Sequence, residues 1–134
     1  MHSSVREFIE HNPIFMLANI GEEGLPKNRA MITLGIFKDK LWFAVTKDKA
    51  VYKELLKDSN IELCAVTLSR WIRITGKVVF EKDKSIIEHV LENSDIMETF
   101  YKNKDQSKED IEVFYIEVTH GMLEDYDTKS RIDF

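Results

Sequence analysis

The stretch LWFAVTKDKAVYKELL, residues 41–56, joins an apolar strand directly to a short amphipathic helix. The run Leu41–Val45 predicts the strand, and Val51 and Leu55 mark the inward face of a helix over about residues 48–58. The start of a helix carries unpaired N–H groups and a partial positive charge. We therefore expect this strand-to-helix junction to be able to hold an anion, and a phosphate in particular.

Polar side chains crowd the junction. Thr46 and Lys47 end the strand, and Lys49 and Lys53 lie one turn apart on the helix, for which we predict Asp48 as the N-cap. A hydroxyl, free amides and lysines together can neutralise a phosphate monoester. The alternative is a surface helix whose lysines serve solubility only. The position of the lysines favours the anion site, because a helix start disfavours cations unless an anion is bound.

Strands are predicted on both sides of this junction. The apolar run Ile14–Ile20 predicts a strand buried on both faces, and Lys27–Phe37 predicts a second strand that forms a hairpin with it. After the helix, Ile61–Leu68 and Trp71–Phe80 predict two more strands, and Gly76 indicates a bulge in the second of them.

The two ends of the chain add a helix and further strands. Ser4 and Glu7 have the spacing of a capping box, which predicts a helix over about residues 4–11. Further along, the pattern predicts a helix over 83–103 broken near 93–95, a charged loop over 102–110, strands over 112–118 and 121–126, and a loosely held tail, DTKSRIDF.

The fold class and the number of domains follow from this pattern and from the chain length. Short strands with close turns and few helices indicate a small closed antiparallel β-barrel, in which closure removes exposed strand edges. A chain of 134 residues predicts one domain, residues 1–134.

Composition excludes several classes of protein. The net charge of -5 argues against a general nucleic-acid or anionic-membrane surface. No apolar run approaches the roughly 20 residues that span a bilayer. The single cysteine, Cys64, fits a reducing cytoplasm, and the four histidines lack metal-binding spacing. We expect a cytoplasmic protein without a metal, a nucleic-acid partner or a membrane partner.

Two other strand faces carry candidate binding residues. Arg29 shares a face with Met31, where a guanidinium can fork onto a phosphate or a polarised ring oxygen; the alternative is a solvated arginine. Trp71 and Arg73 also share a face. They fit a ligand edge or a subunit interface as well as they fit a polar face in water.

Four stretches carry a resemblance to a known family: FMLANIGEEGLPKNRAM, LWFAVTKDKAVYKELLKDSNIELCAV, WIRITGKVVF and EVFYIEV. Their order resembles the pyridoxamine 5′-phosphate oxidase-like family of FMN-binding split barrels, over about residues 14–118. The resemblance implies a mainly β fold, a six-stranded antiparallel split β-barrel with flanking helices. It also implies a homodimer with FMN in clefts at the subunit interface.

The same resemblance implies roles for nine residues in three segments. Arg29, Ala30 and Met31 match the strand beside the flavin ring and ribityl chain. Thr46 and Lys47 match the strand end near the phosphate, and Lys49 and Lys53 match the helix that holds it. Trp71 and Arg73 match the strand whose copy in the partner chain approaches the cofactor.

Two departures from the family pattern bear on the reaction. Ala50 and Val51 stand where true pyridoxamine phosphate oxidases have an Arg-Lys pair, and the sequence contains no Arg-x-Pro motif. Both departures argue against vitamin B6 oxidation. We expect an FMN-binding homodimeric flavoprotein, a small oxidoreductase, with no side chain assigned as catalytic. The alternatives are a non-catalytic sensor or carrier for a flavin, deazaflavin or haem, and a cofactor-free interaction dimer.

Overall fold

Eight strands form one antiparallel sheet in the computed structural model, which describes residues 1–96 and 110–134. The strands are β1 Ile14–Ile20, β2 Pro26–Ile32, β3 Gly35–Phe37, β4 Lys40–Thr46, β5 Asn60–Val66, β6 Arg70–Phe80, β7 Ile111–Asp125 and β8 Ser130–Asp133. The helices of the described ranges are α1 Ser3–His11, α2 Ala50–Lys57 and α3 Lys84–Glu92.

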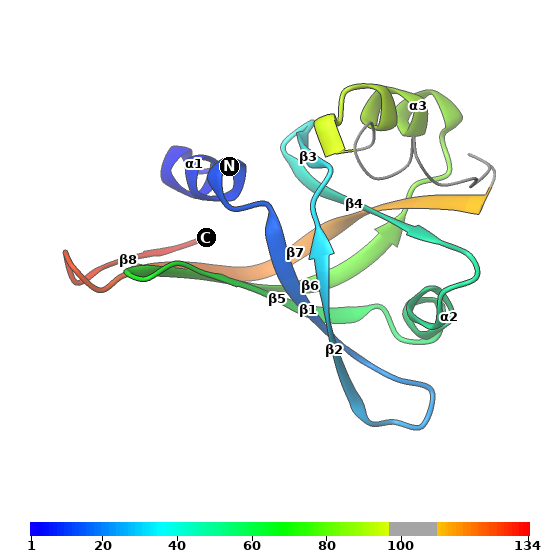
Figure 1. The fold of residues 1–134 in the computed structure, drawn as a ribbon, viewed down its shortest axis with the longest axis horizontal. Coiled ribbons are helices and arrows are strands. Elements are labelled where there is room, and N and C mark those ends of the chain that lie inside the picture. The colour runs from blue at the N-terminus through cyan, green and yellow to red at the C-terminus, as the bar shows by residue number, and fades with distance from the viewer. Residues whose placement is uncertain (97–109) are drawn as a thin grey trace.

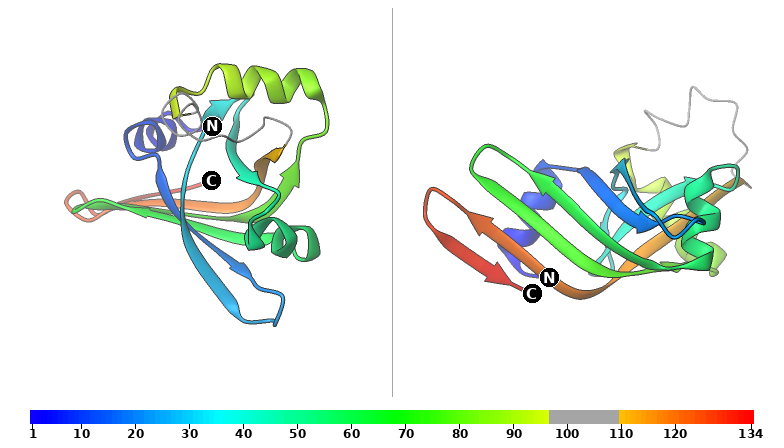
Figure 2. Two further views of the ribbon diagram at one scale, coloured as in Figure 1. Left: turned by 45° about the vertical axis from the view of Figure 1, so that its right-hand side comes forward. Right: turned by 90° about the horizontal axis from the view of Figure 1, so that it is seen from below.

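The sheet curls into a split barrel. The strand order is β2-β1-β5-β6-β7-β4-β3, and β8 pairs with β7. β2 and β3 stand at opposite ends of this order, yet only Thr33 and Leu34 separate them in sequence. The two edges of the sheet must therefore approach each other, and Figures 1 and 2 show the resulting curl, with the β1–β2 hairpin extending away from it. The predicted architecture is confirmed, with eight strands in the described residues instead of six.

The strand predicted over Lys27–Phe37 is divided, and this accounts for one additional strand. Gly35 has a φ of 122°, a conformation that strongly favours glycine. The buried Thr33 hydroxyl donates to the Trp42 carbonyl (2.8 Å) and accepts from the Gly35 amide (3.0 Å). The chain therefore turns at Thr33 and passes from one edge of the sheet to the other.

The carboxyl-terminal tail provides the other additional strand. The expectation of a loose tail was wrong, because β8 pairs with β7 from Met122–Asp133 to Asp125–Ser130. Ile132 and Phe134 alternate along this segment and pack against the core. The predicted strands over 112–118 and 121–126 are parts of one long strand, β7.

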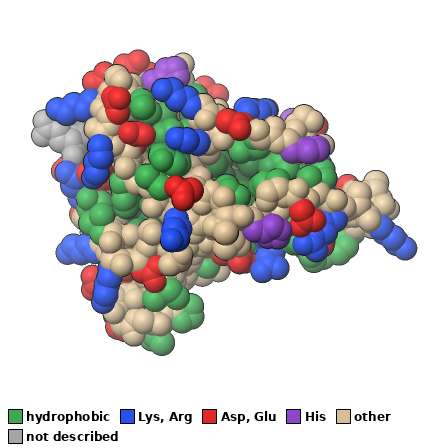
Figure 3. Space-filling model, turned by 180° about the vertical axis from the view of Figure 1, so that it is seen from behind, with side chains coloured by type: hydrophobic (Ala, Val, Ile, Leu, Met, Phe, Trp, Pro, Cys, Tyr) green, Lys and Arg blue, Asp and Glu red, His purple; other side chains and the backbone are tan. Residues whose placement is uncertain are grey.

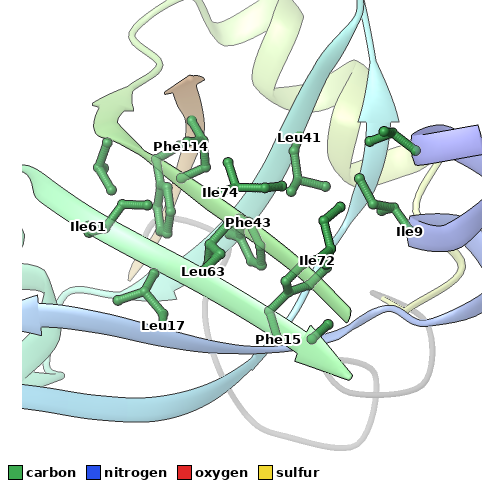
Figure 4. Packing of buried hydrophobic residues seen from close by; sticks show 14 of the residues in the cluster. Ile9, Phe15, Leu17, Leu41, Phe43, Ile61, Leu63, Ile72, Ile74 and Phe114 are labelled. Atoms are coloured by element: carbon green, nitrogen blue, oxygen red, sulfur yellow. The ribbon is translucent and has the colours of Figure 1, made fainter. Parts of the chain in front are cut away.

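The main core fills the inner face of the curled sheet. Phe15, Leu63 and Ile72 are each fully buried there, and Phe43 stacks on Phe114 with ring centroids 5.6 Å apart. Figure 4 shows these side chains, from β1, β4, β5, β6 and β7, pointing toward one another, with Ile9 of α1 to one side of them. Each such burial stabilises the fold by roughly 1.5–3 kcal/mol, so the inner face dominates the stability.

The outer face of β1 differs from the sequence prediction. Phe15, Leu17 and Asn19 are buried, but Ile14 is 60% exposed and Met16 41% exposed. The prediction of a strand buried on both faces was therefore wrong for this chain. No described element covers the outer side of β1, so its apolar residues lie on the surface.

The bulge predicted at Gly76 is confirmed. The β6–β7 register shifts between Thr75 and Gly76. A Cβ atom at position 76 would collide with the backbone carbonyl of Glu117. The close approach of the two strands at this bend therefore requires glycine.

The helix starts differ from the predicted capping. The capping box at Ser4 was wrong, because α1 begins one residue earlier and the His2 ring accepts from the Ser4 amide (3.1 Å). α3 ends at Glu92 with Asn93 as its C-cap, as the predicted break indicated, and Val90 is buried against Trp42 and its neighbours. The second predicted helical piece and the charged loop lie largely within residues 97–109, outside the described residues.

Candidate functional site

The junction between β4 and α2 contains a buried hydroxyl without a clear partner. Thr46 ends β4 and is 5% exposed. Its hydroxyl forms no hydrogen bond with correct geometry to the described residues. Hydrogen bonding from this hydroxyl toward the exposed Asp48 carboxylate is nevertheless the main influence that holds the pKa of that carboxyl below its ordinary value. The Lys49 amide donates to the Thr46 carbonyl (3.1 Å), which folds the chain tightly into the helix.

The start of α2 is uncapped. The prediction of Asp48 as N-cap was wrong: Lys49 occupies that position and provides no side-chain hydrogen bond. Asp48 stands one residue too early, in the turn, where its carboxylate is exposed. The first backbone N–H groups of α2 therefore lack a side-chain acceptor, although such groups normally receive one from a side chain, water or ligand.

The four lysines of this region divide into two pairs. Lys47 pairs with Glu112 (Nζ to Oε1, 3.5 Å), and Lys57 donates to the Glu22 carbonyl (3.3 Å). Lys49 and Lys53 are exposed and have no ion pair within the described residues. The amino end of α2 thus combines two free ammonium groups with the free N–H groups. This arrangement can bind an anion, because a bound anion would neutralise the ammonium charges and accept hydrogen bonds from the free N–H groups.

Arg29 lies beside α2 and is held by other protein groups. Its Nη2 donates to Glu54 Oε1 (2.9 Å) and lies 3.4 Å from Asn19 Oδ1. The Arg29 Nε is buried with no partner in the described part of the chain. Met31 packs against the main core, whereas Ala30 points to the opposite, outer face of the sheet.

Trp71 and Arg73 lie on the outer face, away from α2. Arg73 pairs with Glu62 (Nε to Oε1, 3.0 Å), and Trp71 meets Tyr126 edge-on with ring centroids 4.5 Å apart. The outer-face row Ala30–Met16–Cys64–Arg73 crosses three strand spacings of about 4.8 Å each, so roughly 14 Å separate its ends. One chain therefore brings together the junction residues and Arg29, and leaves Trp71 and Arg73 on another surface.

Sequence reasoning missed Glu54 and Asn19. Glu54 is 6% exposed and Asn19 is 3% exposed, and the Asn19 amide donates to Glu54 Oε1 (3.2 Å). A signal for Glu54 was present, because it follows Val51 by three residues and precedes Leu55, both on the buried face of the helix. Asn19 gave no comparable signal, since it continues an otherwise apolar strand.

Within 1–96 and 110–134, no three His, Cys, Asp or Glu side chains come close enough to share a metal ion. None of the helices in those ranges has the length and apolar character needed to span a bilayer. The cytoplasmic location stays a prediction.

The curled sheet and the uncapped cationic helix start define a split-barrel protein with a candidate anion site. A family model described as pyridoxamine 5′-phosphate oxidase matches residues 1–123. The chain therefore belongs to this family of pyridoxamine 5′-phosphate oxidase-like proteins. A comparison with curated proteins gives no match.

Solved structures with the same fold include proteins of several kinds. A NimC/NimA family protein from Clostridium acetobutylicum superposes with a TM-score of 0.77 at 20% identity, covering 98% of this chain and 91% of that one. A pyridoxamine 5′-phosphate oxidase-related, FMN-binding protein from Nostoc punctiforme gives 0.70 at 13%, covering 99% and 95%. A heme-binding protein from Mycobacterium smegmatis gives 0.73 at 12%, covering 96% and 55%. At these identities the similarity shows the fold alone.

Proposed function

We propose that this protein binds FMN, with the phosphate at the amino end of α2, and acts as a homodimeric oxidoreductase. One observation carries the proposal: the uncapped start of α2, which follows the buried Thr46 and carries Lys49 and Lys53, two exposed lysines without an ion pair in the described residues. A dianionic phosphate would supply acceptors for these donors and offset the conflict between lysines and the helix dipole. The FMN-binding relative from Nostoc punctiforme supports the choice of cofactor.

The residues present fit a phosphate better than they fit a metal or a haem. The junction offers ammonium, hydroxyl and backbone N–H donors, and its turn carries one exposed carboxylate, Asp48, whose pKa is lowered mainly by hydrogen bonding from Thr46. The four histidines, at positions 2, 11, 89 and 120, lie outside this junction. Bound FMN would supply the redox chemistry; the protein's share is to hold the phosphate and orient the ring. No described side chain of the site stands out as a general acid or base.

The homodimer is supported by the outer face of the sheet. Ile14, Met16 and Ile20 of β1 and Val66 of β5 are between 39% and 69% exposed. Clustered exposed apolar residues of this kind mark interaction surfaces. Figure 3 shows hydrophobic patches between charged side chains on the rear of the molecule. A partner seated on the outer face would cover β1 and bring its own Trp71 and Arg73 toward the cofactor.

The cofactor is tested by the visible absorption spectrum of the protein as purified. The proposal predicts a flavin spectrum, or its appearance when FMN is added. A Soret band, or no spectral change with FMN, would reject the assignment. Sedimentation of the same sample tests the dimer, and a monomer would reject that part.

The phosphate site is tested by Lys49→Ala with Lys53→Ala. We expect FMN affinity to fall about 10- to 100-fold, because two charge-assisted contacts are lost, while the dimer stays folded. The matched control is Lys82→Ala with Lys84→Ala, which removes two exposed lysines around the start of α3. Unchanged FMN affinity in the first variant would reject the phosphate assignment.

A further inference from the structure

Glu54 is an unusual residue for its position. Of the residues described, it is the only charged one that is buried in the fold, at 6% exposure. Burying a carboxylate is costly unless it is paired and hydrogen-bonded. A solubilising role is excluded by burial, and Glu54 shares the inward face of α2 with Val51 and Leu55. A specific contact must therefore account for it.

The contact is a closed triad from three elements. Glu54 Oε1 accepts from Arg29 Nη2 (2.9 Å) and from Asn19 Nδ2 (3.2 Å), and the same Nη2 lies 3.4 Å from Asn19 Oδ1. β1, β2 and α2 each provide one member. The guanidinium is thus fixed through one nitrogen, while the Arg29 side chain remains 29% exposed.

A purely structural role is the main alternative to a role in binding. The triad also ties the β1–β2 hairpin to α2. A second tie between these elements already exists, however, because Lys57 donates to the Glu22 carbonyl at the hairpin tip. An ion pair alone would not need Asn19, whereas Asn19 contacts both Glu54 and Arg29 and so restricts the orientation of the guanidinium.

We propose that Glu54 and Asn19 are positioning residues that hold Arg29 ready for the cofactor phosphate. Glu54 lies four residues after Ala50, which is about 6 Å along the helix axis. The carboxylate that holds Arg29 therefore belongs to a residue about one turn from the uncapped start of α2. Held there, its Nη1 adds a donor to the lysine and N–H cluster, and the guanidinium need not be ordered when the phosphate arrives. This inference rests on the proposed function.

The test compares two substitutions at one position. Glu54→Gln keeps the length and an acceptor for Arg29, and Glu54→Ala removes the tether. We expect FMN affinity to fall about tenfold in Glu54→Ala and to be retained in Glu54→Gln. Riboflavin, which lacks the phosphate, should bind equally to both variants and to the unchanged protein. A structural role would instead weaken both ligands together.

A double-mutant cycle with Arg29→Ala tests whether Glu54 affects FMN binding through Arg29. We expect Glu54→Ala to cause no further loss of FMN affinity once Arg29 is removed, because Glu54 acts through Arg29. Full additivity would overturn the proposal. Asn19→Ala, expected to lower FMN affinity a few-fold, provides the same cycle if Glu54→Ala fails to fold.

Different results would overturn the FMN assignment and the positioning role of Glu54. If the unchanged protein prefers FMN to riboflavin and Glu54→Ala keeps that preference, the positioning role is overturned and the FMN assignment stands. If the unchanged protein shows no such preference, both are overturned.

Discussion

The helices α2 and α3 have similar lengths but begin in opposite ways. At α3, Asp83 accepts from the Ser85 amide (2.9 Å) and from the Ser85 hydroxyl (2.7 Å). At α2, Lys49 stands in the cap position and offers no acceptor. An acidic cap satisfies the free N–H groups and complements the helix dipole, whereas a lysine does neither.

The difference shows which helix start is complete on its own. Nothing at α3 calls for a ligand, since its amides and charge are already matched. α2 has no side-chain cap, and beside it lie the buried Thr46 hydroxyl and two lysines that form no ion pair with the described residues. An uncapped helix start lowers the stability of the fold, and such a feature is expected at a binding site, where the ligand supplies the missing acceptors.

The largest effect is expected when α2 is given the kind of cap that α3 has. Lys49→Asp places a carboxylate where the phosphate is proposed to bind and provides an acceptor for the helix N–H groups. FMN affinity should fall by about 100-fold or more, while the thermal midpoint rises by about 1–2 °C. Lys84→Asp makes the same charge change in the first turn of α3 and should leave FMN binding unchanged. FMN affinity that survives Lys49→Asp would contradict the site.

A smaller effect is expected from the buried hydroxyl at the junction. Thr46→Val keeps the shape and removes a donor that the described residues do not properly satisfy. We expect FMN affinity to fall about tenfold while the free energy of unfolding stays level or rises by about 1 kcal/mol.

Thr33→Val is the matched control for that change. The Thr33 hydroxyl is equally buried but makes two hydrogen bonds, so its loss should lower the free energy of unfolding by about 1–2 kcal/mol. Equal destabilisation by the two substitutions would show that the Thr46 hydroxyl is satisfied within the fold. Titration calorimetry measures the FMN affinity, and scanning calorimetry measures the stability of each variant.

The smallest effect is expected at the complete helix start. Asp83→Ala should lower the thermal midpoint by a few degrees and leave FMN binding unchanged. Hydrogen bonds from the Ser85 hydroxyl and amide lower the pKa of Asp83 from its ordinary 3.8. The lowered pKa means that the cap stabilises fully above 3.8, and that its contribution fades as pH falls through the lower folded value.

Thermal unfolding against pH checks the sign of that last prediction. The unchanged protein and Asp83→Ala should differ at neutral pH and converge in strong acid. A difference that grows on acidification would contradict the capping role.

The parts of the fold that could be predicted from sequence are those in which pattern and packing agree. The alternation in β5 and β6 placed Ile61, Leu63 and Ile72 correctly in the core. Gly76 marked the bulge because few other residues tolerate such a close approach. The strand-to-helix junction was visible because an apolar run meets a helical period within a few residues.

The remaining features depend on contacts that sequence patterns do not display. The tail pairs with β7 only because Ile132 and Phe134 reach a core built by distant segments. The outer face of β1 was predicted to be buried because its residues are apolar. In the structure no described part of the chain covers this face, so these residues are exposed. The triad of Asn19, Arg29 and Glu54 joins residues 10 to 35 positions apart, so local spacing could not reveal it.

We propose that the amino end of α2 binds the phosphate of FMN. Titration of the flavin-free protein with FMN and with riboflavin, which differ only in that phosphate, tests this site. We expect FMN to bind at least about tenfold more tightly than riboflavin, and Lys49→Asp to remove the preference. Equal affinity for the two flavins would contradict it.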